Sequence, residues 1–137
     1  MVNYEFLLNV NFISTSAMVG IIWVIQLLHY PSFHFINEMK YVEFQHFHMT
    51  RISFIVIPVM FLELTSALLL GYFFRSILTI ILIIILVGIW GVTFIFFTNI
   101  HQDLTKGYDN NIVNWLVKIN WCRTALWSLR LIILLSI

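Results

Sequence analysis

The sequence predicts an all-α fold, an antiparallel four-helix transmembrane bundle that forms a single membrane domain over residues 1–137. The first reason is composition: 61% of the residues are hydrophobic and 9% are charged, whereas a soluble domain carries about 25% charged residues. The second is a mean hydropathy of +0.98. The third is that the apolar residues form four stretches, each as long as the roughly 20 residues that a spanning helix needs.

The first predicted helix covers residues 6–30 and ends at Pro31, because proline cannot continue a helix. A signal peptide begins with positive charges, but this chain carries Glu5 near its start, so we expect the helix to be retained. The next stretch, residues 31–47, is rich in aromatic side chains and is predicted to lie along the membrane interface.

The second predicted helix covers residues 48–74, and the third covers residues 76–106. The connection between them is so short that they must form a hairpin. Gly107 follows the third helix, as is typical of a left-handed C-terminal cap. The fourth predicted helix covers residues 112–137. Three polar residues before it are candidate N-caps: Asp109, Asn110 and Asn111.

The basic residues predict the orientation of the helices. The first and third connections contain Lys40 and Lys106, and Arg51 and Lys118 occupy the adjoining helix ends. The opposite side offers Arg75 alone. Because cytoplasmic loops carry the excess of lysine and arginine, we expect these two connections in the cytoplasm and both termini outside.

The charge balance and the cysteine content exclude several classes of function. A formal net charge of +1 gives no footprint for nucleic acid and no reason to expect an acidic partner. The single cysteine, Cys122, excludes an internal disulfide and a metal site built from cysteines alone. The partner that the sequence does predict is the lipid bilayer.

The fourth helix carries a stripe of polar and aromatic residues along one face. An arginine in the middle of a membrane costs about 2.5–3.5 kcal/mol on insertion scales, so this face should turn inward and find partners. We interpret Asn120, Thr124 and Trp127 as ligand-binding residues. The stripe follows the helical spacing i, i+3, i+4, i+7: Asn120, Arg123, Thr124, Trp127 and Arg130.

Glu63 in the second helix is the expected partner of Arg130. At a rise of about 1.5 Å per residue, Arg130 lies about 10 Å from the C-terminal end and Glu63 about 13 Å from the end of its helix. Because these depths match, we predict an ion pair between them. A buried pair of this kind can act simply to register two helices.

All histidines fall on the side of the first and third connections. His29, His46 and His101 come from three different helices and are candidates for catalysis or metal binding. Arg123 is a further candidate for catalysis. A haem would require facing histidines such as His29 and His101, with Arg51 and Arg123 for its propionates. His34 and His48 are interpreted as solvated interfacial residues.

Several motifs recur along the four predicted helices: His29-Tyr30-Pro31, His46, Pro58-Val-Met60, Glu63, His101-Gln-Asp-Leu104, Gly107, Asn120-Trp-Cys-Arg123-Thr124, Trp127 and Arg130. Together they resemble a family of small bacterial four-helix membrane proteins that are mostly described as uncharacterised. This resemblance covers nearly the whole chain and implies the bacterial inner membrane, but it implies no activity. A looser likeness, in size and helix count, is to membrane proteins that include anthrone-oxygenase-like members.

Three functions are compatible with these patterns. The first is an intramembrane pocket near the cytoplasmic face, lined by histidine and arginine, that binds a small apolar molecule or a redox cofactor, either a haem or a metal. In an enzymatic version, a histidine acts as acid or base and Arg123 stabilises negative charge. The second is an accessory subunit with a flat apolar face and no internal cavity. The third is a conduit for protons or small solutes, because ionisable groups inside membranes mark such paths.

Overall fold

The computed structural model describes residues 3–137, and the regular structure within them is helical throughout. The first rod begins with helix α1 (Tyr4–Val24), which Asn3 caps by accepting a hydrogen bond from the backbone N–H of Phe6. It continues through a π-helical segment, Ile25–His29, and a 3₁₀ segment, Pro31–Phe35. A π-helical segment adds one residue to a turn and is frequently found at functional sites.

Helix α2 (Tyr41–Phe73) begins seven residues earlier than the sequence predicts. Together with the 3₁₀ segments Pro31–Phe35 and Glu38–Lys40, this makes most of the expected interfacial stretch helical. Tyr41, Gln45 and His48 turn one buried face of α2 toward the bundle. Burial of this face explains the early start, because packing against other elements supplies most of the stability of a helix in a protein. The helix passes through Pro58 without ending.

The third rod consists of α3 (Ile77–Val92), a π-helical segment (Thr93–Phe97) and α4 (Thr98–Leu104). Gly107 follows it with a φ of +146°, which only glycine adopts easily. The last rod is α5 (Asn110–Leu134). Its N-cap is Asp109, whose carboxylate accepts hydrogen bonds from the backbone N–H groups of Asn111 and Ile112.

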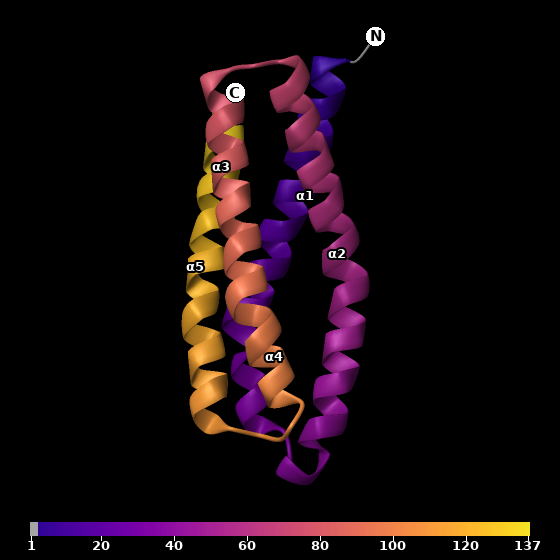
Figure 1. The fold of residues 1–137 in the computed structure, drawn as a ribbon, viewed down its shortest axis with the longest axis vertical. Coiled ribbons are helices and arrows are strands. Elements are labelled where there is room, and N and C mark those ends of the chain that lie inside the picture. Colours follow the sequence, from indigo (N-terminus) through magenta and orange to yellow (C-terminus); the bar gives the residue numbers. More distant parts are fainter. Residues whose placement is uncertain (1–2) are drawn as a thin grey trace.

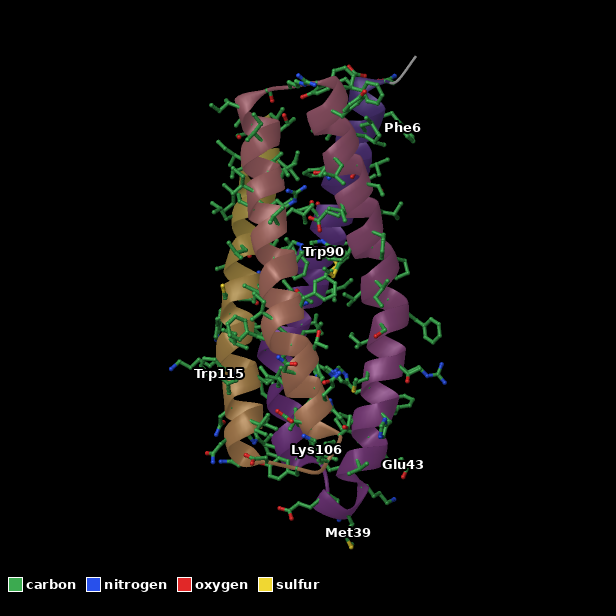
Figure 2. The ribbon with its side chains drawn as sticks, in the orientation of Figure 1. Phe6, Met39, Glu43, Trp90, Lys106 and Trp115 are labelled. Atoms are coloured by element: carbon green, nitrogen blue, oxygen red, sulfur yellow. The ribbon has the colours of Figure 1, made fainter. Side chains whose placement is uncertain are left out.

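The four rods lie side by side along one long axis (Figure 1). The turn between α2 and α3 lies at the same end as both termini, and the other two connections lie at the opposite end. Met39, Glu43 and Lys106 mark that opposite end, while Phe6 marks the end with the termini (Figure 2). Helix α1 packs against α2 and α5, and α3 packs against α5.

Three of the rods described here are long and apolar enough to cross a membrane: Tyr4–Phe35, Glu38–Phe73 and Ile77–Leu104. Only 22–33% of the most apolar window of each is buried inside the protein, so most of its apolar side chains face outward. Helix α5 is not apolar enough to belong to this group, although the sequence predicts a fourth apolar span. Its charged residues lower its hydropathy, and two of them, Arg123 and Arg130, are buried against the other helices.

Candidate functional site

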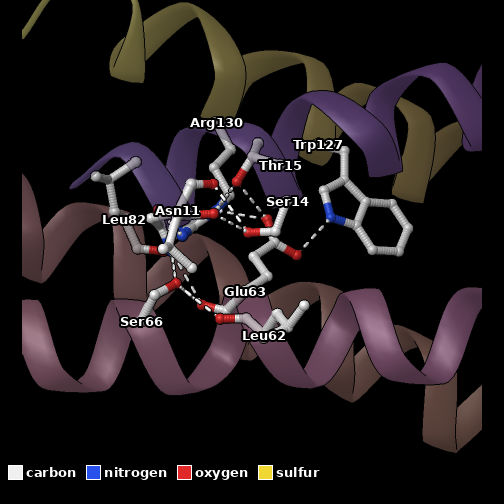
Figure 3. Close-up of polar contacts among 10 residues, drawn as sticks. Asn11, Ser14, Thr15, Leu62, Glu63, Ser66, Leu82, Trp127 and Arg130 are labelled. Carbon is white, nitrogen blue, oxygen red and sulfur yellow. Dashed lines mark hydrogen bonds and ion pairs between the residues drawn. The ribbon is translucent and has the colours of Figure 1, made fainter. Parts of the chain in front are cut away.

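The expected pair of Glu63 and Arg130 is present at the centre of a buried polar network (Figure 3). Arg130 Nε lies 2.9 Å from Glu63 Oε1, and both side chains are fully buried. The same carboxylate accepts hydrogen bonds from Thr15 Oγ1 at 2.7 Å and from Trp127 Nε1 at 3.0 Å. The other arginine nitrogens donate to Asn11 Oδ1 and to the backbone carbonyl of Leu82.

This network joins all four rods and satisfies its own charges. Both oxygens of Glu63 and all three nitrogens of Arg130 have partners within the protein. A buried ion pair of this kind is strongly destabilised when one member is removed, because the other is left charged and unpaired. The network therefore positions the helices and offers no free group to a ligand.

Helix α5 makes a second polar contact closer to its middle. Asn120 Nδ2 donates to Gln26 Oε1 at 2.9 Å, and Gln26 Nε2 donates to the carbonyl of Val117 at 3.2 Å. Thr124 Oγ1 donates to the backbone carbonyl of Asn120. Asn120, Thr124 and Trp127, which are interpreted as ligand-binding residues, are buried and do not line the cavity described below.

Histidines from three rods meet at the end away from the termini. His29 Nε2 and His48 Nδ1 are 2.7 Å apart and share one hydrogen bond. The ring centroids of His48 and His101 are 5.3 Å apart. His101 is held by two further contacts, from Nε2 to the hydroxyl of Tyr30 at 3.3 Å and from Nδ1 to the amide of Gln45 at 3.0 Å.

The histidine that α2 contributes is His48, whereas the candidates His46 and Arg51 lie outside this cluster. Both side chains are exposed on the outer face of α2, and Arg51 lies over the ring of Phe47. Glu43, one turn before His46 on that outer face, points away from the bundle (Figure 2). The signal that identifies His48 is its spacing of i, i+4, i+7 with two other buried residues of α2: Tyr41 and Gln45.

The remaining histidine, His34, lies apart from this cluster. It is partly buried, and its Nδ1 lies 2.9 Å from the hydroxyl of Tyr108 in the connection before α5. This contact joins the first and third connections, so His34 is held by a partner rather than simply solvated.

A cavity of about 400 Å³ lies between α2 and the third rod and is partly open to the outside. Its volume is within the range of ligand pockets, roughly 300–1,000 Å³. Trp90 occupies the space between α3 and α2 near the far end of the cavity (Figure 2). Four polar side chains form one end: Tyr30, His48, His101 and Arg123. Mostly apolar side chains form the walls, among them Ile52, Val56, Met60, Trp90, Phe94 and Phe97.

Three of the residues around the cavity contain buried polar atoms without a hydrogen-bond partner. They are His48 Nε2, Trp90 Nε1 and Arg123 Nε. Native proteins pair most buried polar atoms, and an exception calls for an explanation such as a bound molecule. The guanidinium of Arg123 contacts aromatic faces instead, 4.3 Å from the Phe97 ring centroid and 5.2 Å from that of Trp127.

The two π-helical segments contribute to the same site. The first, Ile25–His29, immediately precedes Tyr30 and contains His29. The second, Thr93–Phe97, supplies three cavity residues and the ring beneath Arg123. Each extra residue rotates the chain that follows by about 100°. These distortions therefore bring Tyr30 and His101 to one end of the cavity.

The structure does not bring together the candidate metal ligands His29, His46 and His101, because His46 is exposed on the outer face of α2. Within residues 3–137, no group of three or more histidine, cysteine, aspartate or glutamate side chains is placed to hold a metal ion. His29 and His48 bond to each other at 2.7 Å. Two nitrogens bound tetrahedrally to one zinc ion would lie about 3.3 Å apart, so metal binding would have to break this contact.

No family model matches the sequence, and neither a curated protein nor a solved structure shows significant similarity to it. The resemblance to small bacterial four-helix membrane proteins therefore stays a prediction, and the function is inferred from the geometry of the site.

Proposed function

We propose that the chain is an antiparallel four-helix transmembrane bundle that binds a small, largely apolar molecule in the cavity between α2 and the third rod. The three apolar rods and their outward-facing side chains support a membrane location. We further propose the bacterial inner membrane, with both termini outside. Lys40 and Lys106, at the end nearer the histidines, support that orientation.

The observation that carries this proposal is the chemistry of the cavity. Its walls are mostly apolar, while one end presents a tyrosine, two histidines and an arginine. Apolar walls with a few convergent polar groups are typical of sites for small molecules. Because α2 and the third rod are both apolar enough to contact lipid, a hydrophobic molecule can reach the cavity from the bilayer.

The two alternative functions receive less support. An accessory subunit is expected to lack an internal cavity, whereas one of about 400 Å³ is present here. A conduit needs polar groups free to bind water or solute along the membrane, but Glu63 and Arg130 are saturated by contacts with other side chains and the backbone. A haem between His29 and His101 is also less favoured, because His29 is hydrogen-bonded to His48.

The test is to fill the cavity without disturbing the fold. Ser53 lines the cavity, whereas Thr50 on the same helix is exposed and outside it. We expect a small molecule to copurify stoichiometrically with the native chain and with Thr50→Trp, and to be lost from Ser53→Trp. Mass spectrometry of solvent extracts measures this. Equal retention by Ser53→Trp, or the absence of such a molecule from all three proteins, would contradict the proposal.

A further inference from the structure

We infer that the molecule bound in the cavity is a single-chain monoanion, whose carboxylate pairs with Arg123 and whose alkyl tail lies along the apolar walls. This inference rests on the proposed function and adds the chemical class of the ligand.

The buried charges of the protein do not balance. Among residues 3–137, the buried charged side chains are Glu63, Arg123 and Arg130. The single buried carboxylate is fully engaged by Arg130, Thr15 and Trp127. Arg123 is 5% exposed and belongs to no ion pair in this part of the chain. One positive charge therefore lacks a counter-ion.

The neighbours of Arg123 do not supply this counter-ion. The side chain lies over the rings of Phe97 and Trp127 and beside the hydroxyl of Tyr30. Cation–π contacts and a neutral hydroxyl offset only part of the cost of burying a charge. Its Nε also lacks an acceptor. The missing partner is thus an anion that also accepts hydrogen bonds, and the cavity beside Arg123 gives it room.

The charge and shape of the Arg123 side chain favour a carboxylate head group. A single uncompensated charge matches a monoanion, and a planar carboxylate fits the fork of donors that a guanidinium presents. His48 Nε2, the unpartnered nitrogen of a second cavity residue, can hydrogen-bond to the same group. A phosphate monoester would bring up to two negative charges and would leave one of them uncompensated.

The shape of the cavity favours a single tail. Along α2 the cavity extends from His48 to Phe61, which is about 20 Å at the helical rise. A volume of about 400 Å³ spread over this length makes the cavity long and narrow. This shape suits one extended alkyl chain better than the two chains of a phospholipid.

The test measures binding of radiolabelled dodecanoate to the full chain in phosphatidylcholine nanodiscs, with empty nanodiscs as background. Dodecanol and dodecyltrimethylammonium, with the same tail and no negative charge, compete for the site. We expect dodecanoate to bind saturably. Dodecanol and dodecyltrimethylammonium should each compete with about 10- to 100-fold lower affinity than unlabelled dodecanoate, because hydrogen bonds to a charged group contribute a factor of this size.

Variants then locate the head group. Arg123→Met should weaken dodecanoate binding by the same factor and leave competition by dodecanol unchanged. Arg51→Met removes an exposed arginine outside the cavity and should change neither. The comparison of ligands on the native chain does not depend on whether Arg123→Met folds.

The outcomes separate this inference from the proposed function. If dodecanol or the ammonium compound competes as well as dodecanoate, the cavity binds apolar molecules but the acid is wrong. If a two-chain phosphatidylglycerol competes better than dodecanoate, the anion is a lipid phosphate and the single-chain inference is wrong. If none of these molecules binds above background, the proposed function fails together with the inference.

Discussion

Replacing Glu63 tests whether the buried network holds the helices together. In Glu63→Ala, three donors lose their acceptor: Thr15, Trp127 and Arg130. Arg130 also loses its carboxylate while it stays fully buried. Removing one member of a buried pair leaves an uncompensated charge, so we expect the free energy of unfolding to fall by about 3–5 kcal/mol. Glu63→Gln, which keeps one acceptor oxygen, should cost less.

The assay is reversible unfolding in mixed micelles, with increasing fractions of a denaturing detergent and helix content as the signal. Glu43→Ala removes an exposed glutamate from the same helix and should change the free energy of unfolding by less than about 0.5 kcal/mol. The double variant Glu63→Met with Arg130→Met removes both charges together. It should therefore cost clearly less than the two single replacements added.

Two results would refute this reasoning. One is a Glu63→Ala variant whose free energy of unfolding is within about 1 kcal/mol of that of Glu43→Ala, because removing one member of a buried ion pair should cost several times more. The other is a double variant whose loss equals the sum of the single losses, which would mean that Glu63 and Arg130 do not interact energetically.

Three further replacements test the fold with the same unfolding assay. His48→Ala breaks the hydrogen bond to His29 and should lower the free energy of unfolding by about 1–3 kcal/mol. His46→Ala removes an exposed side chain and should lower it by less than about 0.5 kcal/mol. Equal losses would contradict the assignment of His48 as the buried histidine of α2. Asp109→Ala removes the N-cap of α5 and should lower the free energy of unfolding by about 1 kcal/mol. Asp103→Ala removes an exposed carboxylate that pairs with Lys106, and should lower it by less. Gly107→Ala forces a side chain onto a φ of +146° and should cost about 1–3 kcal/mol, so an unchanged stability would show that this turn is not formed.

Much of the fold follows from patterns that are local in the sequence. Three of the four rods are evident from the apolar stretches, and the polar stripe on α5 is buried as its helical spacing requires. The contact of Glu63 with Arg130 follows from counting depth along two helices, because a long straight helix converts residue number directly into height. These are properties of single helices, so the sequence contains them.

The candidate site depends on rotations that local patterns do not contain. His46 and His48 differ by two positions, and which of them faces inward depends on how α2 rotates against its neighbours. Because α2 begins as early as Tyr41, Gln45 and His48 lie on its buried face. The sequence predicts this face only if the stretch 31–47 is taken as helical. The π-helical segments rotate the residues that follow them, and the spacing of apolar residues in the sequence does not predict this rotation.

Composition and spacing alone therefore determine that this chain forms long apolar helices with buried charges on specific faces. Helical periodicity is a property of a single helix, so the sequence shows it without any knowledge of the helices that pack against it. The cavity, the exclusion of Asn120 and Thr124 from it, and the uncompensated charge of Arg123 were decided by the tertiary structure. They arise where four helices meet, because the space left between side chains depends on the rotation and height of every helix at once.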